Sequence, residues 1–473
     1  MRICVILEGC YPYVTGGVSS WMHQYIQAMP QHEFVVWAIN ADPSQNGKFR
    51  YQLPDNVVEV REVSLISQAS RRDRRHDLKF SDAELGAMRE LVECGKPDWD
   101  ILFRIFQEKK VSPAEFLSSE YFLDILTEIC RQKYTYTAFS DYFHTIRSML
   151  FPLLYVMCSD VPEADVYHTI ATGYAGVLAR LGGWKYNVPF ILTEHGIYTR
   201  EREEEIIRAN WVLPDFKDLW IRFFYMLSSA AYDGASMVTS LFKRASLTQM
   251  EIGADPSLCR FIANGIRYEK FSPIPERAPA DTIHIGAILR IAPIKDVKTM
   301  LYAFAEVEQH IPAARLFIAG PEDDPEYALE CRNLMRQLGI KNAVFMGTIN
   351  VLEYMGDFDF TVLSSISEGQ PLSVLESFAA GRPCVTTDVG CCKELIFGDG
   401  DDELGQAGYC VPPMQPHELA RAMEDLCRNS ARRLQMGRIA KKRAEMYFRH
   451  EDMIRNYLEV YREVFRRWEA GKD

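Results

Sequence analysis

The stretch Glu368-Gly-Gln-Pro-Leu-Ser-Val-Leu-Glu376, followed by Ser-Phe-Ala-Ala-Gly-Arg-Pro-Cys-Val-Thr, carries most of the information about the fold. Residues 359–364 before it predict a strand. Pro371 suits the first position of a helix, where a missing N–H has no partner to lose, and the small residues 379–381 would end that helix. Free N–H groups and the positive dipole end of such a helix favour a phosphate. The two flanking glutamates would then suit the hydroxyls of a group attached to it, such as a diphosphate-linked sugar.

The length and composition indicate a multidomain globular protein. A chain of 473 residues is too long for one core and predicts two or three domains. Hydrophobic residues make up 48% and charged residues 25%, which is typical of globular chains. The net charge of −12 argues against a general nucleic-acid binder, because such proteins are usually basic. The basic run at residues 71–79 is a local exception, and it predicts either a solvated loop or a docking surface for an anionic partner or membrane.

The cysteines and the apolar runs predict a cytoplasmic protein. The 12 cysteines include no CxxC pair, and Cys391-Cys392 has no companions at zinc-site spacing, so packed free thiols in a reducing compartment are expected. Residues 2–7 start directly as a strand, which leaves no room for a targeting segment before the fold. The longest apolar run, residues 149–158, is too short to span a bilayer.

Residues 1–275 predict a Rossmann-like domain because strand and helix patterns alternate. Residues 2–7 are almost continuously apolar, as in a parallel strand buried on both faces, and residues 18–29 follow with a helical pattern. Between about residues 65 and 160 the alternation stops, and amphipathic patterns such as 114–131 and 142–157 predict a helical insertion. Further strand candidates are residues 34–39, 165–169, 189–193, 236–239 and 259–262.

Residues 276–449 predict a second domain of the same class. It follows a linker-like segment, Phe271-Ser-Pro-Ile-Pro-Glu-Arg-Ala-Pro. From residue 416 the chain is almost wholly helical with a break near Arg449-His450, and residues 450–473 are expected to form a helix that packs back on the first domain. The whole pattern predicts an α/β fold with two Rossmann-like domains facing each other across a cleft. The second set of strand candidates is residues 282–289, 315–319, 343–346, 358–363 and 384–386.

Arg290 and Lys295 lie just beyond the predicted strand that ends at Leu289. Ligands of open α/β sheets bind outside the carboxyl ends of strands, and Glu368 follows another strand of the same domain. An arginine fork and a lysine point charge would suit a diphosphate, although taken alone the pair equally fits two solvated loop charges. Asp357-Phe-Asp359 offers two carboxylates to a metal ion. However, Asp359 starts a buried strand, and two carboxylates specify little.

Gly16-Gly17 and His195 are the candidates in the first domain. The glycine pair stands between a strand and a helix, as in a phosphate-binding turn, but a tight turn would explain it as well. His195 follows a buried strand and could hydrogen-bond a substrate or serve as a structural loop histidine; Glu194 is equally ambiguous. Because Gly-x-Gly-x-x-Gly does not follow the first strand and no P-loop sequence occurs, a dinucleotide dehydrogenase and a P-loop NTPase are disfavoured.

Taken together, these segments resemble the retaining glycosyltransferases of family 4, which have the GT-B architecture. The opening Glu8-Gly-Cys-Tyr-Pro-Tyr-Val-Thr-Gly-Gly-Val-Ser-Ser-Trp and the form Ser-Glu-Gly-Gln-Pro-Leu resemble a narrower, PelF-like group, the cytosolic glycosyltransferases of bacterial Pel exopolysaccharide synthesis. The family resemblance covers most of the chain and rests on the Gly16-Gly17 loop, Thr193-Glu-His-Gly, Ile262-Ala-Asn-Gly-Ile with Phe271, Arg290 with Lys295, Phe317-Ile-Ala-Gly-Pro, Phe345-Met-Gly-Thr, the Glu368/Glu376 pair and Asp388-Val-Gly-Cys-Cys-Lys-Glu394.

The resemblance implies a role for each candidate. Arg290 and Lys295 would bind the donor diphosphate, Glu368 the sugar hydroxyls and Glu376 the ribose hydroxyls. His195 would lie near the transferred sugar, Gly16-Gly17 near phosphate and acceptor, and the base against residues 347–349. The implied catalytic set is Arg290, Lys295, Glu368 and His195, and the implied nucleotide-sugar set is Gly16, Gly17, Arg290, Lys295, Thr348, Ile349, Glu368, Gly369, Gln370, Pro371, Leu372, Ser373 and Glu376.

Two positions depart from the family pattern. Many relatives have Gly-Phe-Gly after the first glutamate, whereas Gln370 and Pro371 follow Gly369 here, and this could alter sugar selectivity. Many also have Gly-Gly before the later glutamate, where Cys391 replaces the second glycine; this could be a packing change only.

The resemblance implies a retaining, metal-independent hexosyltransferase that uses a UDP-sugar, with UDP-glucose the first choice, and needs no cofactor. Its implied partners are a growing saccharide acceptor and an inner-membrane polysaccharide synthase complex that would recruit it to the membrane, with no nucleic acid. Two alternatives remain. A GT-B-shaped sugar-nucleotide epimerase would form product without an acceptor. A non-catalytic UDP-sugar-binding subunit regulating a membrane synthase would bind without turnover.

Overall fold

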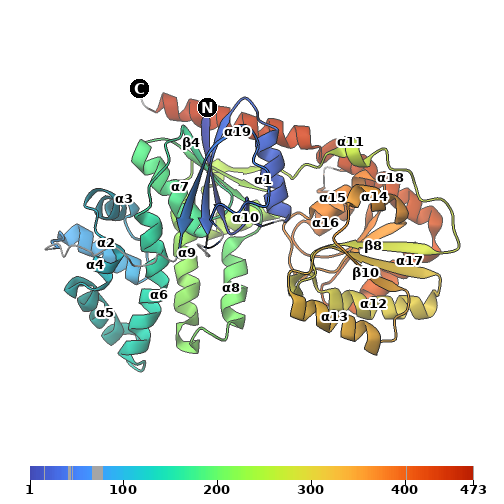
Figure 1. Cartoon of the computed structure of the whole chain (residues 1–473), viewed down its shortest axis with the longest axis horizontal. Coiled ribbons are helices and arrows are strands. Elements are labelled where there is room, and N and C mark those ends of the chain that lie inside the picture. The colour runs from blue at the N-terminus through green and yellow to red at the C-terminus, as the bar shows by residue number, and fades with distance from the viewer. Residues whose placement is uncertain (15, 41–43, 45, 66–77, 401, 472–473) are drawn as a thin grey trace. The chain divides into compact units, whose positions relative to one another are not determined.

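The computed structural model describes residues 1–473 except 15, 41–43, 45, 66–77, 401 and 472–473, so most of the basic run at 71–79 lies outside the described part. The chain divides into two compact units (Figure 1). The first unit comprises Met1–Phe261 and Leu458–Asp473, and the second comprises Ile262–Tyr457. Each unit contains one parallel sheet with helices, which confirms the predicted fold class.

The first unit is built on a seven-stranded sheet in the order β3-β2-β1-β4-β5-β6-β7. The order reverses between β1 and β4, and such a switch point is where α/β sheets bind ligands. The sequence predicted every strand of this sheet except β3, an edge strand in which Glu59, Arg61 and Glu62 interrupt the apolar pattern. The strands are β1 (Arg2–Glu8), β2 (Glu33–Asn40), β3 (Val57–Ser64), β4 (Val166–Thr169), β5 (Phe190–Glu194), β6 (Met237–Ser240) and β7 (Cys259–Phe261).

Two groups of helices belong to this unit. The connecting helices are α1 (Gly17–Gln27), α7 (Gly173–Tyr186), α8 (Tyr198–Arg208), α9 (Lys217–Gly234) and α10 (Lys243–Ile252). The inserted helices lie between β3 and β4 in the chain and are α2 (Asp82–Val92), α3 (Trp99–Phe103), α4 (Pro113–Leu117), α5 (Glu120–Lys133) and α6 (Phe139–Met157). The segment 114–131 is helical, as its pattern predicted, but it forms two helices, α4 and α5. They are separated at Ser118-Ser119, where the Ser119 hydroxyl accepts the N–H of Phe122 and starts α5.

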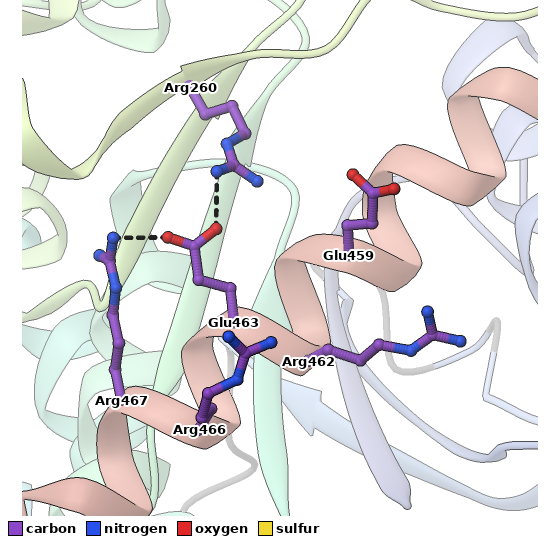
Figure 2. A pocket seen from close by; sticks show the side chains of 6 residues that line it. All are labelled: Arg260, Glu459, Arg462, Glu463, Arg466 and Arg467. Atoms are coloured by element: carbon purple, nitrogen blue, oxygen red, sulfur yellow. Dashed lines mark hydrogen bonds and ion pairs between the residues drawn. The ribbon is translucent and has the colours of Figure 1, made fainter.

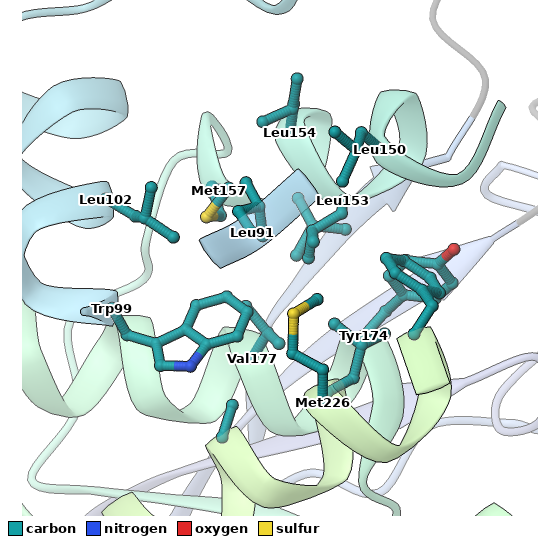
Figure 3. Packing of buried hydrophobic residues seen from close by; sticks show 14 of the residues in the cluster. Leu91, Trp99, Leu102, Leu150, Leu153, Leu154, Met157, Tyr174, Val177 and Met226 are labelled. Carbon is teal, nitrogen blue, oxygen red and sulfur yellow. The ribbon is translucent and has the colours of Figure 1, made fainter. Parts of the chain in front are cut away.

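The inserted helices share a hydrophobic core with the first sheet's helices. Leu91 of α2, Trp99 of α3 and Leu153 of α6 are all at most 4% exposed and lie in one cluster with Val177 of α7 and Met226 of α9 (Figure 3). Because side chains from both groups fill the same interior, the insertion is part of the first unit's core and not a separate appendage.

The second unit is built on a six-stranded sheet in the order β10-β9-β8-β11-β12-β13. The sequence missed β13, a short edge strand. The strands are β8 (Ile283–Ile288), β9 (Ala314–Ala319), β10 (Ala343–Gly347), β11 (Phe360–Leu363), β12 (Cys384–Thr387) and β13 (Gly408–Val411). The helices are α11 (Tyr268–Phe271), α12 (Val297–His310), α13 (Pro325–Gln337), α14 (Val351–Tyr354), α15 (Leu372–Ala379), α16 (Cys392–Phe397), α17 (Pro416–Arg428) and α18 (Ser430–Tyr447).

The last helix, α19 (His450–Ala470), begins in the second unit and ends in the first. Its start follows the predicted break at Arg449-His450. In the first unit, the Tyr461 hydroxyl accepts a hydrogen bond from Tyr25 of α1 at 2.8 Å and lies 2.6 Å from Nδ1 of His168 on β4. All three residues are buried, so this polar contact anchors the end of α19 on the first sheet. No helix in the described residues is long and apolar enough to cross a membrane.

Candidate active site

Lys295, Glu368 and Ser365 meet at the carboxyl edge of the second sheet. Lys295 lies in the turn after β8, and the two others lie in the loop after the neighbouring strand β11. Lys295 Nζ donates to Glu368 Oε1 at 2.6 Å, and the Ser365 hydroxyl donates to the same oxygen at 2.5 Å. The side chains of Lys295 and Glu368 are 15% and 9% exposed, so this charge-assisted pair is largely shielded from solvent.

The loops that carry these side chains are bonded to each other. The Ser364 hydroxyl donates to the backbone carbonyls of Lys295 and Asp296 at 2.9 and 3.0 Å. The Ile366 N–H donates to the carbonyl of Ile294 at 2.9 Å. These bonds hold the backbone on both sides of the Lys295–Glu368 pair, so its position is set by the sheet and not by the side chains alone.

Arg290 lies on the same sheet edge but has a different partner. Its guanidinium Nη1 donates to Asp323 at 2.7 Å, and the Arg290 side chain is 47% exposed. No hydrogen bond or ion pair joins Arg290 to Lys295 or Glu368 in the described part of the chain. The structure therefore brings Lys295 and Glu368 together and leaves Arg290 as a half-exposed cation beside them.

The Gln370-Pro371 turn starts α15 as the sequence indicated, one residue later than expected. Pro371 is the N-cap and the helix begins at Leu372, with Ser373 next. The side-chain oxygen of Gln370 accepts the N–H of Asn264 at 2.6 Å, and Gln370 is 8% exposed. The side-chain oxygen of Gln370 is therefore engaged inside the second unit. The helix ends at Ala379, and Gly381 adopts φ +72°, which confirms the predicted C-terminal stop.

Glu376 lies on α15 one turn from its start, and its carboxyl group forms no hydrogen bond or ion pair among the described residues. Burial disfavours the charged form and raises the pKa of this carboxyl to about 7. A partly buried carboxyl with a raised pKa and no protein partner marks a candidate binding position, because a ligand can supply the missing hydrogen bonds.

The loop after β12 closes on the backbone of the Glu368 turn. Gly390 has φ +54°, and a Cβ there would lie 2.2 Å from the Glu368 carbonyl oxygen and 2.4 Å from that of Gly369. The N–H of Cys391 donates to the Gly369 carbonyl at 3.1 Å, and the Cys391 side chain is buried. Gly390 is thus required by a close backbone approach, whereas Cys391 is a packed core residue.

Thr348 and Ile349 follow β10 at the same edge of the second sheet. They come after Gly347, which has φ +68° and accepts the N–H of Gly320 at 2.8 Å. Thr348 is exposed and Ile349 is partly buried. Both lie just beyond the carboxyl end of β10, and their contact with the base stays a prediction.

Gly16, Gly17 and His195 lie in the first unit. Gly17 opens α1 after β1, and a Cβ on either glycine would meet nothing within 4 Å. His195 follows β5, and its ring lies edge-on to Trp21 of α1 with centroids 4.5 Å apart. Burial lowers the pKa of His195 to about 4, so the ring is neutral at pH 7. Its Nε2 is buried without a hydrogen-bond partner in the described structure, which is rare for a buried polar atom.

Glu194, which the sequence left ambiguous, has structural partners. Its Oε2 accepts the Tyr232 hydroxyl at 2.6 Å and the Gln249 amide at 2.8 Å. Burial raises the pKa of this carboxyl, while these bonds act in the opposite direction. Glu194 therefore ties β5 to α9 and α10.

The carboxylate pair Asp357-Phe-Asp359 does not form a chelate. Asp359 accepts from Arg277 at 2.8 Å and from the N–H of His284 at 2.8 Å, and Arg433 lies 3.4 Å away. The described residues contain a different group that could hold a metal ion and that the sequence did not reveal. Its ligand atoms lie within 4.8 Å of one another and belong to Glu306, His310 and Glu424 on α12 and α17.

Comparison with known proteins identifies the family. A family model described as a domain of unknown function (DUF3492) matches residues 1–257, and one described as glycosyl transferases group 1 matches residues 281–429. The chain belongs to the DUF3492 family, whose model covers more than half of it, and residues 281–429 form a group 1 glycosyltransferase domain. This group 1 model covers β8 through α17, including Lys295 and Glu368.

The curated relatives of this glycosyltransferase are distant. MMP alpha-(1->4)-mannosyltransferase of Mycolicibacterium hassiacum is 22% identical over 60% of this chain and 67% of its own length. N-acetyl-alpha-D-glucosaminyl L-malate synthase of Bacillus anthracis is 29% identical over 40% of this chain and 47% of its own length. D-inositol 3-phosphate glycosyltransferase of Kineococcus radiotolerans is 28% identical over 47% of this chain and 56% of its own length. The chain thus spans about half to two thirds of the length of these relatives.

Solved structures establish the GT-B fold. Anabaena Alr3699/HepE in complex with UDP and glucose has a TM-score of 0.60 at 13% identity, over 97% of this chain and 98% of that one. Sucrose-phosphate synthase from Thermosynechococcus elongatus has a TM-score of 0.61 at 16% identity, over 98% of this chain and 99% of that one. The predicted family and fold are therefore confirmed at the level of a group 1, GT-B glycosyltransferase.

Proposed function

We propose that this glycosyltransferase transfers a hexose from a UDP-sugar to a growing exopolysaccharide, with retention of anomeric configuration and without a metal ion. The observation that carries the proposal is the shielded Lys295–Glu368–Ser365 group at the carboxyl ends of β8 and β11, next to the start of α15. A cation, a fixed carboxylate and free helix N–H groups provide contacts for a diphosphate and for sugar hydroxyls in one place.

Lys295 is proposed to stabilise the leaving diphosphate. As the sugar–phosphate bond breaks, negative charge grows on the leaving oxygen and positive charge grows on the sugar carbon. The ammonium group has three N–H donors and Glu368 uses one, so two are free to bind phosphate oxygens. A preorganised donor of this kind lowers a barrier by about 3–4 kcal/mol, which supplies chemistry that a metal ion would otherwise provide. Arg290 would add charge by exchanging its Asp323 partner for phosphate.

Glu368 and Glu376 are proposed to recognise different parts of the donor. Both hydrogen bonds to Glu368 described above use Oε1, so Oε2 is left to accept a sugar hydroxyl. The unpartnered carboxyl of Glu376 would accept the two ribose hydroxyls. In the first unit, neutral His195 would hydrogen-bond the transferred sugar through Nε2, and Gly16-Gly17 would leave room for phosphate and acceptor.

UDP and glucose are the first probes because a solved structure with the same fold, HepE of Anabaena, holds both. An exopolysaccharide acceptor is proposed from the sequence resemblance to the PelF-like group. Putative glycosyltransferase EpsD of Bacillus subtilis, 25% identical over 62% of this chain, is a further relative. The proposal places the enzyme in the cytoplasm, recruited to the inner membrane by a polysaccharide synthase.

The test is a panel of nucleotide sugars, with UDP release and UDP binding measured with and without acceptor and with and without EDTA. Transfer from UDP-glucose that survives EDTA and is lost in Lys295→Ala would support the proposal. Lys298→Ala is the matched control, because Lys298 pairs with Glu330 on the exposed side of α12. Acceptor-independent conversion of the UDP-sugar would instead indicate an epimerase. UDP binding without turnover on any acceptor of the panel would indicate a regulatory subunit.

A further inference from the structure

A charged pocket on the first unit is not used by the proposed reaction. It has a volume of about 430 Å³ and is lined by six charged residues (Figure 2): Arg260, Glu459, Arg462, Glu463, Arg466 and Arg467. Arg260 belongs to the edge strand β7, and the others form one face of α19 at helical spacing. The volume falls in the range of small-molecule sites.

The backbone around this pocket is anchored from the opposite face of α19. Val460, Tyr461 and Val464 of that face are at most 2% exposed, and Tyr461 is bonded to Tyr25 and His168. The charged face is therefore presented by a helix that is packed on the sheet, and its side chains start from fixed backbone positions.

Two of the arginines are oriented by Glu463. Its carboxylate accepts from Arg260 at 2.6 Å and from Arg467 at 2.5 Å, bridging β7 and α19 (Figure 2). Carboxylate bridges of this type hold guanidinium groups in place and leave their other N–H groups available. The bridge also neutralises part of the positive charge without removing the donors.

The remaining two arginines have no ion-pair partner in the described part of the chain. Arg462 and Arg466 are one turn apart on α19, both are exposed, and like charges at this spacing repel each other and destabilise the helix. The pocket carries four arginines against two glutamates, although the whole chain has a net charge of −12. An anion between Arg462 and Arg466 would relieve their repulsion.

We propose that this pocket binds a phosphoryl anion, held by Arg462 and Arg466 with Arg260 and Arg467 as further donors. Planar guanidinium forks match phosphate oxygens in pairs, which is why clustered arginines recognise phosphoryl groups. The phosphoryl group comes either from a small phosphorylated solute or from the headgroup of an anionic lipid. The site is separate in sequence and in fold from Lys295 and Glu368, and it does not depend on the transferase proposal.

The experiment measures binding of inorganic pyrophosphate to the full chain by titration calorimetry. Lys295→Ala serves as the background, because the proposed donor site could also bind diphosphate. Arg462→Ala/Arg466→Ala should weaken the remaining site by roughly tenfold to a hundredfold, and raising the salt concentration should weaken it further. Arg421→Ala/Arg438→Ala is the matched control, since it removes two exposed helical arginines of the second unit and should leave the affinity unchanged.

A second arm distinguishes the source of the phosphoryl group. Cosedimentation with phosphatidylglycerol vesicles, compared with phosphatidylcholine vesicles, should be lost in the Arg462→Ala/Arg466→Ala variant if lipid headgroups occupy the site. Arg462→Lys/Arg466→Lys keeps the charge but removes the forks, so it should bind more weakly than the parent and more strongly than the alanine pair. The proposal is overturned if the alanine pair, folded by circular dichroism, matches the control variant towards both pyrophosphate and anionic vesicles.

Discussion

Replacing Glu376 by glutamine should stabilise the second unit above neutral pH. Glutamine has nearly the same shape as a protonated glutamate, so it removes the charge and little else. Desolvation raises the pKa of the partly buried Glu376 carboxyl to about 7 in the folded chain, against 4.5 for an ordinary glutamate. Each pKa unit of difference between the folded and unfolded chain is worth about 1.4 kcal/mol. The fully ionised carboxyl therefore lowers the free energy of unfolding by about 3 kcal/mol.

The sign follows from proton linkage. Between about pH 4.5 and 7 the folded chain holds the Glu376 proton while the unfolded chain releases it, so the free energy of unfolding falls as the pH rises through this window. Because glutamine has no proton to release, the free energy of unfolding of the variant does not fall in this window. The variant should therefore exceed the parent by about 3 kcal/mol at pH 8 and by less than about 1 kcal/mol at pH 5.

The assay must report on the second unit. All seven tryptophans of the chain lie in the first unit, so tryptophan fluorescence follows that unit and far-UV circular dichroism follows both. Guanidinium unfolding at pH 5 and pH 8, monitored by both signals, separates the two transitions. The stabilisation should shift the transition seen by circular dichroism without moving the fluorescence transition.

Glu326→Gln is the matched control. Glu326 is an exposed glutamate in the first turn of α13, where its negative charge favours the helix. Removing this charge should lower the free energy of unfolding of the second unit by less than about 1 kcal/mol. Equal effects of Glu376→Gln at pH 5 and pH 8, or a destabilisation at pH 8, would refute the claim that Glu376 is held as a partly buried carboxyl without a protein partner.

Three further predictions concern binding, catalysis and anchoring. If the Glu376 carboxylate accepts the ribose hydroxyls, UDP affinity measured by calorimetry should fall by up to about tenfold per pH unit below pH 7, and this dependence should vanish in Glu376→Gln. Lys295→Ala should lower kcat by roughly 10²- to 10³-fold while Lys298→Ala leaves it unchanged, and equal rates would contradict the role of the Lys295–Glu368 pair. Tyr461→Phe should destabilise the first unit by about 1–3 kcal/mol in the fluorescence transition, because Tyr25 and His168 lose a buried partner; an unchanged midpoint would show that the anchor is unimportant.

The sequence predicted the two sheets well because their central strands are short, almost continuously apolar runs. Residues 2–7 and 34–39 became the buried strands β1 and β2. The two strands that it missed, Val57–Ser64 and Gly408–Val411, lie at sheet edges. An edge strand has one neighbour and is only half buried, so its sequence need not be apolar.

The partners of the candidate residues could not be derived from the sequence. Their spacing presents Arg290 and Lys295 as one cationic pair, but the folded chain pairs Lys295 with Glu368 and Arg290 with Asp323. Gln370, considered as a possible selector of the sugar, has its amide oxygen bonded to Asn264, 106 positions away. Such contacts depend on which loops the sheet order brings together.

By itself, the sequence determined the fold class, the glutamate-flanked helix start and the family, because local patterns and short motifs encode these. Only the tertiary structure decided which carboxyl lacks a partner, which histidine nitrogen is buried without a hydrogen bond, and which arginines line one pocket. The reason is that burial and pairing depend on residues distant in sequence. Glu463 on the last helix orients Arg260 on an edge strand, across 203 positions of the chain.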